Sequence, residues 1–422
     1  PGKMGEYKWN AETGEMVQEQ VIDYLDANGC SWVYGKAIHW SGSLIINPKD
    51  FDQIMVSSGN GIFKWDGIWG DSPKASFCAQ GIEEVVALDM VSVPGGAAYS
   101  AIGDYDGFIH TDVDKPATQY VPNMGSTGAI AYCPQNPQVM VRIAENQNDI
   151  APGFYSTDGG KTWTKMANTA GGKAAITQLD KDTYRIFLGK KDSGDLSYSD
   201  DWGQTWNACT ALGTGGTSGT VALSANGSTM LWAPNSTKAE TYVSNDNGKT
   251  WYVANGLGFQ PKMAADKVNP SKIYAACGGQ VFASEDGGFN FAPTGALVSD
   301  TTTLYTVDGR EGHVWALSGS IIMFSQDGGK TFENLKNFNA RAMGFGAPKN
   351  AGDYPVLYAM GSSDNVNGIF RSADQGKTWQ RINDDKHQFG NITPYICGDG
   401  SVYGKVYFAT NGRGIVMGDI AE

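Results

Sequence analysis

The stretch SNDNGKTW, residues 244–251, identifies the fold, because versions of it recur along the chain. Six segments follow the pattern Ser-x-Asp-x-Gly-x-(Thr or Asn)-(Trp or Phe), and they begin at Ser156, Ser199, Ser244, Ser284, Ser325 and Ser372. Successive serines are 43, 45, 40, 41 and 47 residues apart. A repeat of this length that carries about four short strands is typical of a β-propeller blade.

Each residue of this Asp box has a mechanical role in a tight hairpin. The Asp is expected to accept hydrogen bonds from backbone N–H groups of its own turn. The Gly supplies the positive φ that ends the turn. The Trp or Phe returns on the next strand and is expected to pack between blades, where a large ring buries much area. The boxes therefore predict architecture and not chemistry.

The ends of the chain continue the pattern without the box residues. GIFKWDGIW (61–69) and GFIHTDVDK (107–115) hold the same place in the period, and GEYKWNAETGEM (5–16) and GKVYFATNGRGIVMGD (404–419) suggest terminal strands. We expect an all-β propeller over residues 28–422, with seven blades and eight as the alternative. Residues 1–27 are expected either to close this propeller or to remain from a preceding one.

Composition supports this fold and excludes several partners. The chain has 422 residues, 18% charged residues, 56 Gly, 12 Trp, 19 Tyr and 17 Phe, which favours many short strands and tight turns. Its net charge of −13 disfavours nucleic acid and anionic membrane surfaces. There is no apolar run long enough to predict a membrane span. The four histidines are dispersed and no cofactor motif occurs, so neither a metal nor a cofactor is expected.

Three segments carry a resemblance to a known family. QGIEEVVALDMVSVPGGAAYSAIGDYDGFIHTDV (80–113) resembles a segment of family 74 glycoside hydrolases, the xyloglucanase family, with the form LEETAVLDLxSPPxGxxLxSALGDxxGFxHDD. IFRSADQGKTWQRINDDKHQFGN (369–391) and ATNGRGI (409–415) resemble the closing sequences of the same family. The likeness covers residues 28 to 419 and corresponds to the C-terminal propeller half of such an enzyme.

The resemblance implies a reaction and a substrate. Family 74 enzymes place two propellers face to face across a cleft that holds a β-1,4-glucan, usually the plant cell-wall polysaccharide xyloglucan, and each propeller supplies one catalytic Asp. Asp89, in ALDM, matches the C-terminal residue, and Asp104, in GDYDGF, is the second choice. Two separated carboxyl groups suit an inverting hydrolysis. The simpler interpretation is that Asp89 caps a turn.

Residues near these aspartates are candidates for binding sugar. Trp40 and Tyr105 are the preferred stacking platforms, with Phe108 beside them and His110 as a source of an orienting hydrogen bond. Aromatic rings also dominate propeller cores, so packing between blades is the simpler interpretation of each ring. For His110 the simpler interpretation is a structural histidine.

Two departures from the family leave three functions open. The chain is too short for two propellers, and the family's N-terminal segment of the form W-G-I-D-S-L-A has no match. The chain is therefore either half of a secreted hydrolase that an N-terminal propeller completes, or a non-catalytic glycan-binding or scaffold propeller. A sialidase is a third and weaker alternative, because those enzymes grip a carboxylate with three arginines and no Arg precedes Arg142.

Overall fold

The computed structural model shows the all-β fold that the sequence predicts. It describes residues 4–10, 12–13, 15–22, 25–34, 41–81, 85–112, 114–146, 152–214, 216–336, 338–389 and 392–420. One short 3-10 turn, η1 (Ser31–Val33), interrupts the strands of these ranges. Within the same ranges, no helix has the length and apolar composition that crossing a bilayer requires.

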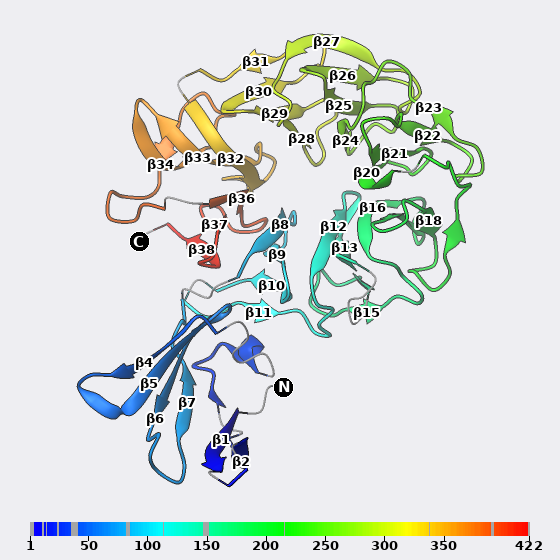
Figure 1. Ribbon diagram of the computed structural model, residues 1–422. Helices are drawn as coiled ribbons and strands as arrows, with labels where there is room; N and C mark the ends of the chain where they lie inside the picture. Colours follow the sequence, from blue (N-terminus) through cyan, green and yellow to red (C-terminus); the bar gives the residue numbers. More distant parts are fainter. Residues whose placement is uncertain are drawn as a thin grey trace.

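Most strands form a ring of antiparallel sheets, each built from consecutive strands (Figure 1). The first four sheets contain β8 (Ala87–Ser92), β9 (Ala98–Ile102), β10 (Asp106–His110) and β11 (Thr118–Gln119); β12 (Thr127–Cys133), β13 (Asn136–Ala144), β14 (Gly153–Ser156) and β15 (Thr164–Lys165); β16 (Gly172–Gln178), β17 (Tyr184–Lys190), β18 (Leu196–Ser199) and β19 (Asn207–Ala208); β20 (Thr217–Leu223), β21 (Met230–Asn235), β22 (Tyr242–Ser244) and β23 (Tyr252–Val253). The next four contain β24 (Lys262–Ala265), β25 (Ile273–Cys277), β26 (Gln280–Ser284) and β27 (Ala292–Leu297); β28 (Thr303–Thr306), β29 (Val314–Ser318), β30 (Ile321–Ser325) and β31 (Glu333–Asn334); β32 (Phe338–Gly346), β33 (Val356–Ser363), β34 (Val366–Ser372) and β35 (Gln380–Arg381); β36 (Ile392–Gly398), β37 (Val406–Thr410) and β38 (Ile415–Gly418).

The ring is closed by its last sheet. Contacts between neighbouring sheets run from β8 through β12, β16, β20 and β24 to β28, then from β29 and β30 to β32, and from β32 to β36, which contacts β8. An isolated bridge joins Val86 to Asn411, and the Tyr407 hydroxyl donates a 3.1 Å hydrogen bond to the His110 carbonyl. The expected count of seven blades is not confirmed, because eight sheets follow one another around the described part of the ring.

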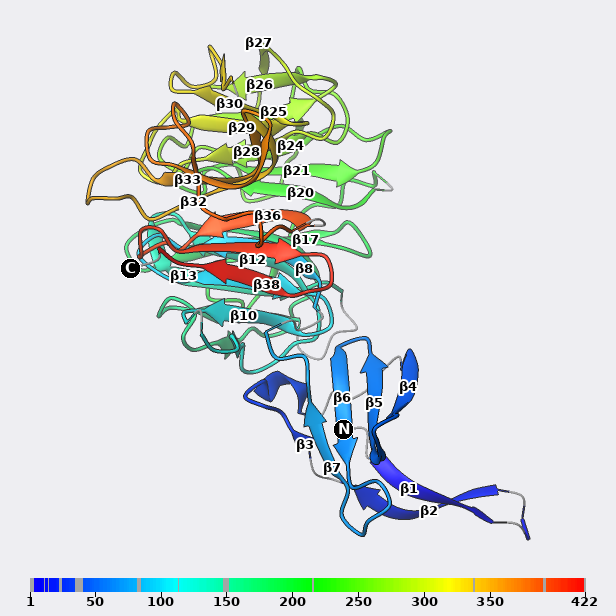
Figure 2. The ribbon, with the colours of Figure 1, turned by 90° about the vertical axis from the view of Figure 1, so that its left-hand side faces the viewer.

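The N-terminal strands form two further sheets outside the ring (Figure 2). One is the hairpin β1 (Met4–Asn10) and β2 (Glu15–Ile22); the other has the order β3 (Leu25–Asp26), β7 (Lys74–Phe77), β6 (Gly61–Asp66), β5 (Asp50–Ser58), β4 (Ser43–Asn47). Its strands run nearly perpendicular to those of the ring in Figure 2. The predicted division of the chain at residue 28 stays a prediction, and the sheets themselves separate near residue 80.

The six Asp boxes have one geometry and the mechanical role that we predicted. In each, the Asp Oδ1 accepts a hydrogen bond of 2.8 to 3.0 Å from the backbone N–H four residues later. The box glycines all have positive φ, from 72 to 100°. The box Ser, whose role the sequence did not suggest, donates to the Asp Oδ1 and accepts from the Gly N–H. Each hairpin is thus fixed by its own side chains.

The core lies mainly between neighbouring sheets. Tyr99 and Tyr120 of the first ring sheet pack with Met140, Phe154 and the box residue Trp163 of the second. Similar clusters occur elsewhere around the ring, with the box rings Trp206, Trp251 and Trp379 among their partly buried members. This packing fixes the inner strands, whose starts carry the candidate site.

Candidate active site at one mouth of the ring

The first strand of each ring sheet starts on the same side of the molecule, because every sheet repeats one strand order. Five of these first strands have a register irregularity close to their start. The irregularities occur at Leu88, Gly128, Ser218–Gly219, Arg341 and the segment after Ile392. Bulges re-aim side chains and occur often at rims and next to active sites. Five first strands are therefore irregular near the same mouth of the ring.

Asp89 faces a cavity of about 450 Å³ at this mouth. The cavity is lined from β8, β12, β16, β20, β21 and β24, so five consecutive sheets contribute to it. Its polar side chains include Asp89, Lys173, Thr220, Asn235, Gln260 and Lys262. Among the described lining residues, Asp89 supplies the sole carboxyl group.

The surroundings of Asp89 favour its neutral form. Burial raises the pKa of the carboxyl group to about 6, although a hydrogen bond from the Met90 N–H and the charge of Lys173 both oppose the shift. The side chain is half-buried by surface area because the cavity reaches it, while protein surrounds its other sides. Burial, and after it the charge of Asp89, also raises the pKa of Tyr305 and of Tyr395, which places both rings near the carboxyl group.

Backbone forms much of the cavity wall. A Cβ atom on Gly128 would lie 2.7 Å from the Glu145 Cα, and Gly219 has φ +92° with the Ala233 carbonyl 2.0 Å from where its Cβ would be. Lys173 crosses from β16 to donate a hydrogen bond to the Gly128 carbonyl. The cavity thus presents peptide groups and hydrogen-bonding side chains, which suits a hydroxyl-rich ligand.

The other aspartates of the predicted segment have different surroundings. Asp104 lies exposed in the turn between β9 and β10 with φ 64°, and its N–H donates to the Ser126 hydroxyl at 2.8 Å. It does not line the cavity that Asp89 lines. Asp106 is fully buried, where it pairs with Arg142 and accepts from Thr127 Oγ1 at 2.7 Å. Asp106 is therefore a link between two sheets.

Three of the four predicted binding residues are in the core at the seam between the ring and the N-terminal sheet. Tyr105 and Phe108 are 3% and 5% exposed and make edge contacts with Trp32, so both rings are largely packed against protein. His110 is buried, and its Nε2 forms a 2.9 Å hydrogen bond with Ser100 Oγ. Burial lowers the pKa of His110 to about 3. Trp40 lies outside the described residues.

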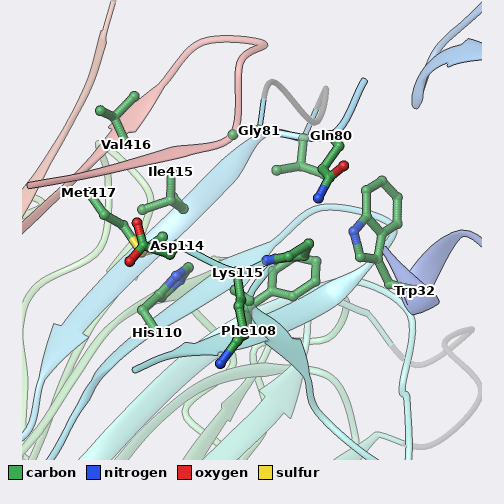
Figure 3. Close-up of a pocket in the computed structure, with 14 residues that line it drawn as sticks. Trp32, Gln80, Gly81, Phe108, His110, Asp114, Lys115, Ile415, Val416 and Met417 are labelled. Carbon is green, nitrogen blue, oxygen red and sulfur yellow. The ribbon is translucent and has the colours of Figure 1, made fainter. Parts of the chain in front are cut away.

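A separate cavity of about 450 Å³ lies at this seam (Figure 3). Trp32 lines one side and Ile415 and Met417 of β38 line the other, with Phe108 and His110 between them. Asp89 does not line it, and His110 is neutral there because of its lowered pKa. We therefore assign the candidate site to the Asp89 cavity. No cluster of three or more His, Cys, Asp or Glu side chains suited to a metal ion occurs in the part of the chain that the structure describes.

A half-buried polar cluster joins sheets on opposite sides of the ring. Tyr132, just before the end of β12, donates 2.6 Å to Asp308 Oδ2, which follows β28. Lys267, which follows β24, donates to the Tyr132 hydroxyl at 2.7 Å and to Asp308 Oδ2 at 2.8 Å. We call these three residues the cross-ring brace. They lie at the ends of the inner strands, and the Asp89 cavity lies at their starts.

Sequence reasoning missed the residues that surround Asp89. Lys173, Ser218 and Lys262 follow a box Trp by 10, 12 and 11 residues, so alignment of the repeats could have found this position. The boxes themselves lie on the outer strands. The residues at the start of each repeat are the ones that indicate the site.

Comparisons with known proteins agree with the fold and also identify relatives over most of the chain. The profile of the BNR/Asp-box repeat matches residues 154–165. The xyloglucanase Xgh74A of Acetivibrio thermocellus is 35% identical over 96% of this chain and 46% of its own length. The oligoxyloglucan-reducing end-specific xyloglucanase of Emericella nidulans is 30% identical over 91% of this chain and 47% of its own length.

Solved structures give the same result. The family 74 xyloglucanase of Xanthomonas campestris superposes with a TM-score of 0.70 at 30% identity, over 97% of this chain and 54% of that one. The family 74 enzyme of Niastella koreensis superposes with a TM-score of 0.68 at 32% identity, over 96% of this chain and 53% of that one. The chain thus spans about half the length of the relatives that it matches.

Proposed function

Because the chain is a homologue of the family 74 xyloglucanases, we propose that it is half of a glycoside hydrolase that cleaves xyloglucan or a related β-1,4-glucan. We propose Asp89 as one of the two carboxyl groups of an inverting mechanism. The observation that carries this proposal is a carboxyl group with a pKa of about 6 beside a polar cavity at the mouth with irregular first strands. Such a substrate implies that the protein works outside the cell.

Asp89 suits the role of general acid. An inverting glycosidase needs one carboxylic acid to protonate the leaving oxygen and one carboxylate to activate water, about 6.5–9.5 Å apart. A pKa raised by burial keeps the proton on Asp89 in mildly acidic solution, and ionisation after transfer is assisted by the charge of Lys173. The bulge at Leu88 directs this position toward the cavity.

The second carboxylate is proposed to come from a module that packs on the N-terminal sheet. The sheet containing β4–β7 leaves Leu44, Ile45, Phe51 and Trp69 61%, 63%, 71% and 77% exposed. Leu44 and Ile45 are neighbours on β4, so apolar side chains are exposed on both faces of this sheet. Exposed apolar surface commonly marks an interface. A module that covers them would lie beside the ring, and the relatives have about as much additional chain as such a module needs.

A hydrolysis assay tests the proposal. The chain, alone and joined to any coding sequence that precedes residue 1, is incubated with xyloglucan while new reducing ends are counted. We expect cleavage by the longer protein and at least a hundredfold loss in its Asp89→Ala variant. No cleavage by the longer protein, or full activity in the variant, would refute the assignment.

A non-catalytic glycan-binding or scaffold propeller is the alternative. The observation that favours it is the single carboxyl group among the described residues of the cavity. Affinity electrophoresis in gels containing xyloglucan or cellulose separates the two functions. Retardation of a protein that releases no reducing ends supports the alternative, and migration unaffected by either polysaccharide contradicts both functions.

A further inference from the structure

We propose that a second cavity on the Asp89 side of the ring is a sugar subsite, which takes one neutral pyranose residue of the bound polysaccharide. The cavity has a volume of about 210 Å³ and lies between the sheet of β32–β35 and the segment 382–389. Arg341, Met360, Asn367, Gln388 and Phe389 line it. The choice of a glycan as ligand rests on the proposed function. The test below distinguishes failure of the subsite from failure of the hydrolase.

Arg341 places this cavity at the same mouth as Asp89. It is the unpaired residue of the β32 bulge and follows the box residue Phe332 by 9 residues. Lys173 and Lys262, which line the Asp89 cavity, follow their box rings by 10 and 11 residues. By strand register the buried Ala342 takes the place of Lys173 and Lys262, and Arg341, the bulged residue beside it, lies at the same end of its strand. A polysaccharide lying across this mouth can therefore reach both cavities.

The Arg341 guanidinium group is available to a ligand. Its side chain is exposed, and neither a hydrogen bond nor an ion pair joins it to any residue of the described ranges. A guanidinium group carries five N–H donors in a fixed plane, and sugar hydroxyls are good acceptors for them. The Asn367 amide adds a donor and an acceptor to the lining, and Gln388 adds its Oε1 acceptor, since Gln388 Nε2 already donates to the Asn367 and Asp384 carbonyls.

Phe389 supplies the apolar wall that a pyranose ring needs. It is half-buried and held in place by an edge contact with Phe408, with ring centroids 4.8 Å apart, and by Arg413, 5.8 Å from the ring centroid. Flat aromatic rings bury the C–H faces of sugars while polar neighbours bind the hydroxyls. The pairing of one ring with several donors favours a neutral sugar over an apolar ligand.

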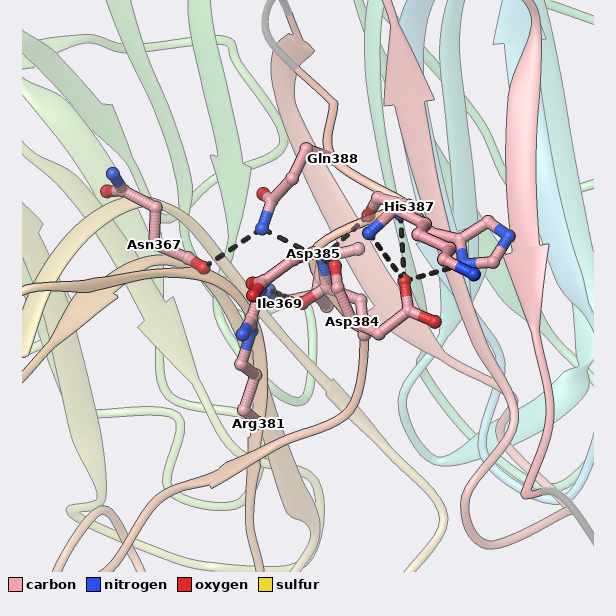
Figure 4. Close-up of polar contacts among 9 residues, drawn as sticks. Asn367, Ile369, Arg381, Asp384, Asp385, His387 and Gln388 are labelled. Atoms are coloured by element: carbon pink, nitrogen blue, oxygen red, sulfur yellow. Dashed lines mark hydrogen bonds and ion pairs between the residues drawn. The ribbon is translucent and has the colours of Figure 1, made fainter.

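Hydrogen bonds within the segment fix its shape before a ligand arrives (Figure 4). Asp384 Oδ1 accepts from the Lys386 and His387 N–H groups at 2.9 and 2.8 Å, and from His387 Nδ1 at 2.7 Å. Asn383 accepts from the Ile369 N–H at 2.8 Å and donates to the His387 carbonyl at 2.7 Å. A preorganised wall lowers the entropy cost of binding.

Calorimetric titration tests the subsite without requiring turnover. The Asp89→Asn chain is titrated with a xylosylated gluco-oligosaccharide and with cellohexaose, so that no hydrolysis depletes either probe. We expect Phe389→Ala and Arg341→Ala each to weaken binding about 10-fold, the loss of one good contact. Phe389→Tyr and Arg341→Lys should lose less, and Lys330→Ala, an exposed cation of an outer hairpin, should bind as its parent does.

The outcomes separate the subsite from the hydrolase. Unchanged binding by both Ala variants, or no binding of either probe by the parent, overturns the subsite. Weakened binding in the Ala variants, together with no cleavage of xyloglucan by the longer protein that retains Asp89, keeps the subsite and refutes the hydrolase. Loss with both probes assigns a backbone sugar to the cavity, and loss with the xylosylated probe alone assigns a branch sugar. If Phe389→Ala does not fold, Phe389→Leu keeps apolar volume without a flat face.

Discussion

The hydroxyl group of Tyr132 donates a 2.6 Å hydrogen bond to Asp308 Oδ2, although 176 residues separate them in the sequence. Lys267 binds both groups, and its ammonium stacks 5.0 Å from the Tyr132 ring centroid. Burial alone would lower the pKa of Lys267, but Tyr132 and Asp308 outweigh burial and raise it. The cross-ring brace therefore holds a charged pair at the end of the ring away from Asp89.

Removal of the cation should destabilise the ring. In Lys267→Met the Asp308 carboxylate stays in place without its counter-ion, and we expect the free energy of unfolding to fall by about 1–3 kcal/mol, since both groups keep some solvent contact. The double variant Lys267→Met with Asp308→Leu should recover part of this loss. Urea denaturation measures both. A single variant as stable as the parent would show that the brace contributes nothing.

The Asp106–Arg142 pair should matter more, because both side chains are fully buried. Arg142 also packs its guanidinium 4.2 Å from the Phe154 ring centroid. We expect Asp106→Asn to lower the free energy of unfolding by about 3–5 kcal/mol, since the Arg142 charge is left unpaired. Asp104→Asn, two residues earlier and exposed, is the matched control and should change stability little in the same urea titration. Equal effects would contradict the assigned roles.

Asp89 should make the folded protein less stable as the pH rises. Its folded pKa of about 6 lies above the ordinary value of 3.8, so the folded state holds the proton more tightly between these values and loses stability as pH increases through them. Asp89→Asn removes this effect, and we expect the variant to be more stable by about 1–2 kcal/mol above pH 7, after allowance for solvent in the cavity. Below pH 4 the difference should vanish. Denaturation midpoints across pH measure it, and a difference that does not depend on pH would contradict the raised pKa.

The boxes should affect stability without affecting binding. Asp201 accepts from the Thr205 N–H at 2.9 Å and from the Thr205 hydroxyl at 2.6 Å, so Asp201→Ala frees one hairpin. We expect a decrease in Tm of about 1–3 °C with unchanged affinity for xyloglucan oligosaccharides. Calorimetry measures both quantities, with the exposed Asp300→Ala as control. A loss of affinity in Asp201→Ala would show that the boxes do more than build turns.

The sequence predicted the parts of this protein that depend on local chemistry. The box residues act within one turn, so Asp158, Gly160 and Trp163 could be assigned from spacing alone. Asp89 was found through a family resemblance, and its place on the first strand of a ring sheet follows from the repeat. The polar residues around it could not be predicted in the same way, because five sheets bring them together.

The predicted binding residues show the limit of sequence proximity. Tyr105 and Phe108 lie near Asp89 in sequence, but β-strand geometry sends them to the seam with Trp32, where they form core. The cross-ring brace and the Arg341 cavity depend on contacts between strands far apart in the chain. Those contacts form only when the ring closes. The number of sheets in the ring could not be predicted by counting the boxes.

The most direct test of the account is the turnover of xyloglucan by two variants of the longer protein. Asp89→Asn and Asp104→Asn are compared with the parent by counting reducing ends across pH. We predict that Asp89→Asn loses about 10²–10⁴-fold in kcat, that Asp104→Asn keeps most activity, and that the parent rate falls above pH 6 as Asp89 ionises. Substantial turnover by Asp89→Asn, with the loss found in Asp104→Asn instead, would contradict the assignment of the site.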